Sequence, residues 1–104
     1  MTEQEFNFIV EKANERSMNI LYIRGREYTT EDEDRLGQFK DAAKIKGCNP
    51  AEALIDQATK QFGALVNMAR NPTKFPLALW QERAGDLRNY TLLIEGLIRD
   101  LGVK

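Results

Sequence analysis

Hydrophobic residues recur along this chain every three or four positions, the spacing that places side chains on one face of an α-helix. Four segments show this pattern. The first begins at Thr2, where Glu5 completes a capping box. Its apolar face is formed by Phe6, Ile9, Val10 and Ala13. The pattern runs on through residues 18–23, as one long helix or two, and Gly25 predicts its end.

The second helix is predicted to begin at Thr30, with a capping box to Glu33, and to end at Gly47. The third is predicted to begin at Asn49, with Pro50 at its first helical position. The predicted apolar faces are Leu36, Phe39, Ala42 and Ala43 in the second helix and Leu54, Ile55, Ala58, Phe62, Leu65, Val66 and Ala69 in the third.

Residues 71–76 contain two prolines and interrupt the pattern. The fourth helix is predicted from Pro76 or Leu77 to Leu101, with Phe75 and Trp80 anchoring its start. No stretch alternates between polar and apolar residues as a half-buried strand does. We therefore predict an all-α fold of about four helices in a single domain, residues 1–104.

The amino-acid composition excludes several classes of function and of catalytic site. Fifteen basic and sixteen acidic residues nearly cancel, which does not favour a nucleic-acid-binding protein. No apolar run could cross a bilayer and no signal peptide is visible, so a cytoplasmic protein without a membrane partner is predicted. The absence of histidine excludes catalysis by a serine–histidine or cysteine–histidine pair, and Cys48 is the only cysteine. A bound metal would be a hard ion such as magnesium, held by carboxylate oxygens.

The apolar stripe of the last helix contains charged residues. Its members are Leu79, Asp86, Tyr90, Leu93, Ile94, Leu97 and Leu101. Arg83 lies in its first half, with Glu82 and Asn89 at its margin. Charges among buried leucines are costly unless they are paired or bound. Glu82 and Asp86, four residues apart, repel unless a cation or proton intervenes, which makes them candidate magnesium ligands. The alternative is that they form ion pairs with Arg83, Arg35 or Lys40.

Asp32 supplies a further candidate carboxylate. It continues the apolar stripe of the second helix, so it could meet Asp86 across a helix interface with Arg35 nearby. Asp34 is expected to point away from that interface. The alternative is that acidic residues 31–34 only stabilise the positive first turn of a helix.

Three basic residues are candidates for binding an anionic ligand. Arg24 and Arg26 precede the second helix, and the planar guanidinium group suits phosphate. A solvated loop explains them equally well. Lys60 lies opposite the apolar stripe of the third helix, so it would reach a site only where that face meets another subunit.

The segment Glu82-Arg-Ala-Gly-Asp86-Leu-Arg-Asn89-Tyr90, followed by leucines, resembles the C-terminal motif of small phage and prophage proteins related to the MazG-like nucleotide pyrophosphohydrolases. The resemblance covers residues 21–101. Upstream segments match weaker features of the same proteins: Arg24-Gly-Arg-Glu27-Tyr28, Glu33-Asp34-Arg35-Leu36 and Phe39-Lys40.

The resemblance implies an all-α dimer or tetramer that binds magnesium and hydrolyses nucleoside triphosphates to monophosphate and pyrophosphate. Glu82 and Asp86 match the metal-binding acidic motif of these enzymes, and Asn89 matches a position next to it. The chain lacks the upstream Glu-Glu-x-x-Glu helix of the enzymes. It also carries Lys60-Gln61 where the phage proteins often have Lys-His. Both departures weaken the prediction of hydrolysis more than that of the fold.

Three hypotheses follow for the function. In the first, a homo-oligomeric MazG-like pyrophosphohydrolase holds magnesium through Glu82, Asp86 and Asp32 and binds a nucleotide through Arg24, Arg35, Lys60 and Asn89. In the second, a catalytically inactive helical phage protein in the host cytoplasm binds a nucleotide or a host protein, in counter-defence or host takeover. In the third, the charges form only an interface network in a structural oligomerisation module.

Overall fold

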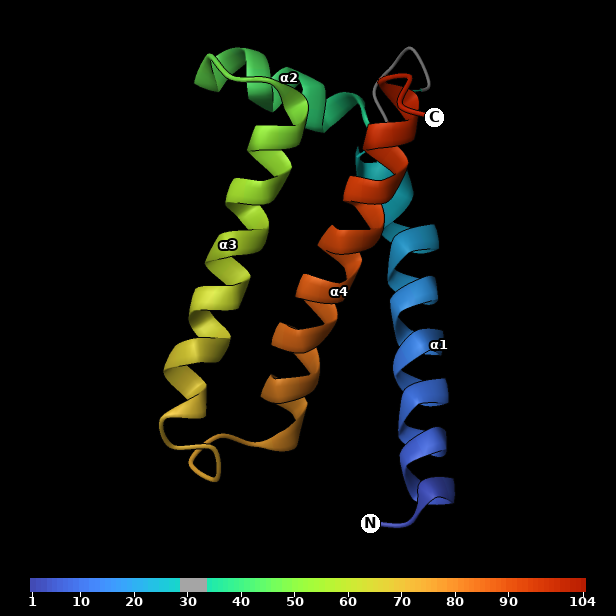
Figure 1. The fold of residues 1–104 in the computed structure, drawn as a ribbon, viewed down its shortest axis with the longest axis vertical. Helices are drawn as coiled ribbons and strands as arrows, with labels where there is room; N and C mark the ends of the chain where they lie inside the picture. The colour runs from blue at the N-terminus through green and yellow to red at the C-terminus, as the bar shows by residue number, and fades with distance from the viewer. Residues whose placement is uncertain (29–33) are drawn as a thin grey trace.

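A computed structural model of the chain describes residues 1–28 and 34–104, except for the side chains of Glu27 and Tyr28. The fold is all-α, as predicted. Its four helices are α1 (Glu3–Tyr28), α2 (Gly37–Lys46), α3 (Pro50–Ala69) and α4 (Leu77–Asp100), and the described residues form no strand (Figure 1). Within the described part of the chain, no helix combines the length and apolar character needed to span a membrane.

Helices α3 and α4 form an antiparallel pair, joined by the turn that contains Pro72 and Pro76 (Figure 1). Helix α2 lies across the end of this pair where α3 begins and α4 ends, and α1 lies on the other side of α4 from α3. The hydrophobic core lies where α2, α3 and α4 meet. Its buried members are Leu36, Phe39, Leu54, Leu93 and Leu97.

The predicted start and stop signals are confirmed at three helix ends. Glu5 N–H donates to Thr2 Oγ1 over 3.1 Å, which forms half of the capping box at the start of α1. Gly47 ends α2 in the left-handed conformation, at φ 73°. Asn49 caps α3, its side chain accepting a hydrogen bond from Glu52 N–H over 2.9 Å. Local sequence therefore determines these boundaries.

Replacing Asn49 with alanine is expected to lower the free energy of unfolding by about 1 kcal/mol, because the Glu52 N–H loses its acceptor. Urea denaturation followed by circular dichroism measures this loss. Asn49→Asp keeps an acceptor oxygen at the cap and serves as the control. A loss equal in both variants would show that the cap itself contributes little.

The predicted end of the first helix at Gly25 is wrong. Helix α1 continues to Tyr28, so Arg24 and Arg26 lie on a helix and not in a solvated loop. Gly25 is buried, and a Cβ atom there would lie 2.7 Å from Nε of Arg35. Arg35 in turn donates to the Leu21 carbonyl over 3.1 Å. The glycine permits this close approach of the arginine to α1 and does not break the helix.

The predicted apolar faces are only partly buried. Leu54 and Ala58 of α3 are buried, whereas Ile55, Phe62 and Val66 of the same predicted face are exposed. On α1, the large apolar side chains of the predicted face, Phe6, Ile9 and Val10, are all exposed. One chain therefore offers too few helices to cover every apolar face.

The predicted start of α2 at Thr30 and its capping box to Glu33 lie outside the described residues.

The sequence predicted that Asp34 would point away from the helix interface, but its side chain makes contacts there. Its carboxylate accepts a hydrogen bond from Leu36 N–H over 3.0 Å and pairs with Lys40 Nζ at 2.7 Å. Lys40 also lies 2.6 Å from Asp100 at the end of α4. These contacts lower the pKa of Asp34 and raise that of Lys40. The lysine thus joins the start of α2 to the last turn of α4.

The start of α4 agrees with the prediction. Trp80 is half-buried, and its indole N–H donates to the Pro72 carbonyl over 3.1 Å. This bond fixes the turn between α3 and α4.

Candidate functional site

Arg88 of α4 joins α4 to α1 by hydrogen bonds to the middle of α1. Arg88 Nε donates to Ser17 Oγ over 2.6 Å, and Arg88 Nη2 donates to the Ala13 carbonyl over 3.3 Å. Ser17 is buried at this contact, as is Gly85 one turn before Arg88 on α4. Next to this contact the two helices leave a cleft, which we call the α1–α4 cleft.

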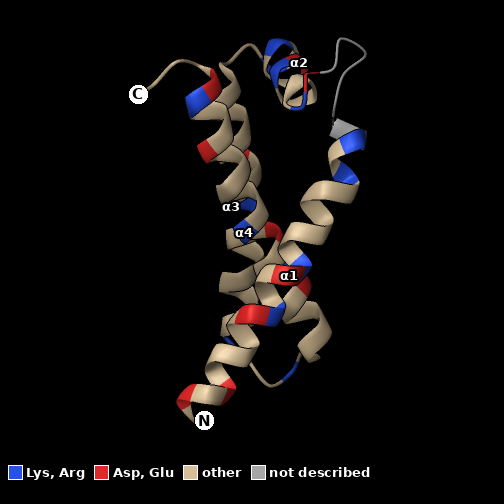
Figure 2. Ribbon diagram, turned by 90° about the vertical axis from the view of Figure 1, so that its right-hand side faces the viewer, with Lys and Arg blue, Asp and Glu red and all other residues tan. Residues whose placement is uncertain are grey.

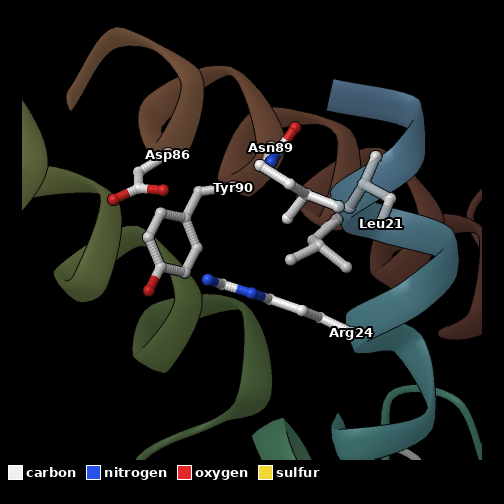
Figure 3. A pocket seen from close by; sticks show the side chains of 7 residues that line it. Leu21, Arg24, Asp86, Asn89 and Tyr90 are labelled. Carbon is white, nitrogen blue, oxygen red and sulfur yellow. The ribbon is translucent and has the colours of Figure 1, made fainter. Parts of the chain in front are cut away.

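The α1–α4 cleft has two compartments that share Ile20, Arg24 and Asp86. The inner compartment is about 100 Å³ and is lined by Ile20, Leu21, Arg24, Asp86, Asn89, Tyr90 and Leu93. The outer compartment is about 230 Å³ and is lined by Arg16, Ile20, Arg24, Gln81, Glu82, Gly85, Asp86 and Arg88. Figure 3 shows the Arg24 side chain extending from α1 across the inner compartment toward Tyr90, with Asp86 on the far side. Both compartments thus place a cationic side chain of α1 near a carboxylate of α4.

Asp86 carries the strongest electrostatic perturbation in the cleft. Burial raises the pKa of its carboxyl group, and the nearby carboxylate of Glu82 raises this pKa further. Arg24 and Arg83 lower the pKa, but their effects are smaller. Among the described residues, no basic side chain forms an ion pair with Asp86 within 4 Å. The carboxylate is therefore held in a site that favours a neutralising proton or cation.

Asn89 is a buried polar residue that lines the inner compartment. The residue is only 6% exposed, and its Oδ1 atom is buried without a hydrogen-bond partner among the described residues. A buried acceptor left unpaired costs about 1–3 kcal/mol.

The cleft presents two neighbouring carboxylates. Glu82 and Asp86 lie one helical turn apart and border the outer compartment. The described residues contain no group of three or more acidic, cysteine or histidine side chains that could hold a metal. Magnesium bound with nucleotides commonly uses one or two carboxylates, and phosphate oxygens and water complete its shell.

The structure brings together four of the residues predicted from the sequence, Arg24, Glu82, Asp86 and Asn89. It does not bring Arg35 or Lys60 to the cleft. Arg35 covers Gly25 and lines a separate apolar groove. Lys60 is exposed on α3, with Asp56 as its ion-pair partner at 3.9 Å. Asp32 lies outside the described residues. The predicted alternative in which Lys40 neutralises Glu82 or Asp86 is wrong, because Lys40 pairs with Asp34 and Asp100.

Sequence reasoning missed Arg16, Arg88 and Tyr90 as lining residues of the cleft. A usable signal was present for the first of them. Arg16, Ile20 and Arg24 follow one another at four-residue intervals, so a helix that continues through this region places all three on one side. The predicted end of α1 at Gly25 assigned Arg24 to a loop and hid this relationship.

Comparisons of the chain with protein-family models, with curated proteins and with solved structures found no match. The functional argument therefore rests on the geometry of the α1–α4 cleft and on the sequence motif within α4.

Proposed function

We propose that this protein binds the magnesium complex of a nucleoside triphosphate in the α1–α4 cleft. The observation that carries the proposal is the convergence of Arg24 from α1 with Glu82 and Asp86 from α4 around one cavity. Arginine is suited to phosphate oxygens and a pair of carboxylates to magnesium. The resemblance of residues 82–90 to the motif of MazG-like pyrophosphohydrolases supports a nucleotide as the phosphate ligand.

The proposal gives each residue a role. Arg24 binds phosphate oxygens, with Arg16 at the open side of the same compartment. Glu82 and Asp86 would hold the ion, which neutralises phosphate charge when bound. Asn89 lines the inner compartment and would contact the part of the ligand that enters it. At about 100 Å³, that compartment is smaller than the roughly 150 Å³ cavity that binds benzene, so the nucleobase lies outside it.

Hydrolysis to monophosphate and pyrophosphate is a second candidate function. It is favoured by the resemblance of residues 82–90 to the motif of the MazG-like pyrophosphohydrolases. The MazG-like enzymes also use acidic residues from a second helix. In this chain the corresponding candidate, Asp32, lies outside the described residues. Binding without turnover is therefore the function that the described geometry supports best.

The proposal places the protein in the cytoplasm, where nucleoside triphosphates are available. We also propose that the chain acts as a homo-oligomer, because several apolar faces are uncovered. A host protein is the alternative partner, and it becomes the leading one if nucleotides do not bind.

Thermal unfolding in the presence of magnesium and a panel of nucleoside triphosphates tests the function, with pyrophosphate release followed in the same samples. A ligand at 100 times its dissociation constant is expected to stabilise the folded protein by about 2.7 kcal/mol. A shift with pyrophosphate release establishes hydrolysis. A shift without release establishes binding alone. No shift with any nucleotide overturns the proposal.

Replacing Arg24 with glutamine is expected to abolish most of this stabilisation, because the cleft loses the arginine that borders both compartments. The matched control is Arg26→Gln, since Arg26 is exposed on the same helix and lines neither compartment. Titration of the nucleotide by calorimetry measures both variants. Equal losses of affinity in the two would point to the general charge of α1 instead of the cleft.

A further inference from the structure

Helix α1 carries more exposed large apolar side chains than any other described helix. Seven of its large apolar side chains are at least 40% exposed: Phe6, Phe8, Ile9, Val10, Met18, Tyr22 and Ile23. Phe6 and Val10 lie on the same side of the helix as Ser17, which is buried against α4. The face of α1 that packs on α4 thus continues, uncovered, toward the N-terminus. Exposed apolar patches of this extent mark interaction sites.

The dimensions of the chain also indicate a missing cover. Its accessible surface is 7,694 Å², whereas a compact monomer of 11.9 kDa exposes about 5,900 Å². The excess is about 1,800 Å² per chain, which is within the range that stable homodimers bury. The radius of gyration is 15.7 Å, compared with about 13 Å expected for a compact domain of this length. The accessible surface and the radius of gyration both exceed the values for a compact monomer, which indicates that one face of the subunit is uncovered.

The charges along α1 are divided between its two halves. Acidic residues prevail in the first half, where Glu3, Glu5, Glu11 and Glu15 outnumber Lys12, and basic residues prevail in the second half, where Arg16, Arg24 and Arg26 outnumber Glu27. Figure 2 shows this change from acidic to basic residues along the helix. A helix divided in this way attracts a copy of itself when the two run antiparallel and repels it when they run parallel. This pattern favours a second copy of the chain over an unrelated partner.

We propose that two copies of this chain associate through residues 5–16 of their α1 helices, packed antiparallel about a two-fold axis near Val10. Phe6, Ile9 and Val10 form the centre of the contact. Glu5 and Arg16 lie on one side of the helix, because eleven residues make three turns. In this arrangement Glu5 of each subunit lies opposite Arg16 of the partner subunit. The contact is isologous, so it closes as a dimer. The argument for this interface does not rest on the proposed nucleotide function, although Arg16 also borders the outer compartment of the cleft.

The mass of the protein in solution tests the proposal, measured by light scattering without nucleotide or magnesium. A dimer of 11.9 kDa chains, about 24 kDa, is expected at micromolar concentration. The double variant Phe6→Glu, Ile9→Glu is expected to be monomeric with unchanged helix content, because both side chains are exposed in the single chain. The control is Ile45→Glu on α2, which changes an even more exposed side chain and is expected to remain dimeric.

The antiparallel order is tested by exchanging charges. Glu5→Lys or Arg16→Glu alone is expected to weaken the dimer several-fold at low salt, by bringing like charges together. The double variant restores opposite charges and is expected to recover the wild-type dissociation constant. A monomeric wild-type protein overturns the proposal, as does a dimer that survives Phe6→Glu, Ile9→Glu. A double exchange that fails to recover affinity overturns the antiparallel order.

Discussion

Replacing Asp86 with asparagine is expected to raise the melting temperature of the ligand-free protein at neutral pH and to abolish its stabilisation by magnesium and nucleotide. Burial and Glu82 raise the pKa of the Asp86 carboxyl, so the folded state holds this proton more tightly than the unfolded state does. Above the folded-state pKa the ionised carboxylate lowers stability, and this loss disappears as pH falls through that pKa. Asparagine keeps the shape and removes the charge.

Thermal unfolding of the wild type and Asp86→Asn as a function of pH measures this effect. The gain in stability is expected at neutral pH and is expected to vanish under acidic conditions, where Asp86 is protonated in both states. Asp41→Asn is the control, since Asp41 is exposed on α2, away from the cleft. An asparagine variant that is less stable than the wild type at neutral pH, yet binds nucleotide normally, would remove Asp86 from the proposed site.

The second large effect is expected at Leu97, in the core. This side chain is fully buried where α4 packs against α2 and α3, so Leu97→Ala is expected to lower the free energy of unfolding by about 2–5 kcal/mol. For a small domain with a total stability of about 5–15 kcal/mol, this is a large fraction. Chemical denaturation measures the loss.

Leu92→Ala is the matched control on the same helix, because Leu92 is 42% exposed and outside the core cluster. Its loss is expected to be well below that of Leu97→Ala. Similar losses for the two variants would mean that the core does not lie where α2, α3 and α4 meet.

The fold could be predicted from the sequence because its signals are local. A capping box at Asn49, a glycine at position 47 and two prolines between α3 and α4 each define a boundary with a few neighbouring residues. Helical periodicity then gives the helices between them. Gly25 was misread because its role depends on a contact with Arg35 of another element, which local spacing does not contain.

The candidate site could be predicted only in part, for a related reason. Glu82, Asp86 and Asn89 lie within one helix, so their grouping follows from spacing alone. Arg24 and Asp86 line the same cleft, and the hydrogen bonds from Arg88 to Ser17 and Ala13 hold α1 against α4 there. Periodicity does not report which face of one helix meets which face of another. Arg35 and Lys60 were assigned to the site because the sequence does not show which helix faces meet.

The attachment of α1 has a thermodynamic consequence. The helix rests on the other helices from Ala13 onward, through the hydrogen bonds of Arg88 and Arg35, while its first half has no support from them. A continuous helix moves largely as one body, so a partner that fixes the first half also restricts the distance between Arg24 and Asp86. If binding of a partner to α1 favours one width of the cleft, the partner changes the affinity for the ligand by some factor. Binding of the ligand must then change the affinity for the partner by the same factor. The single long helix would then make assembly and ligand binding one coupled equilibrium.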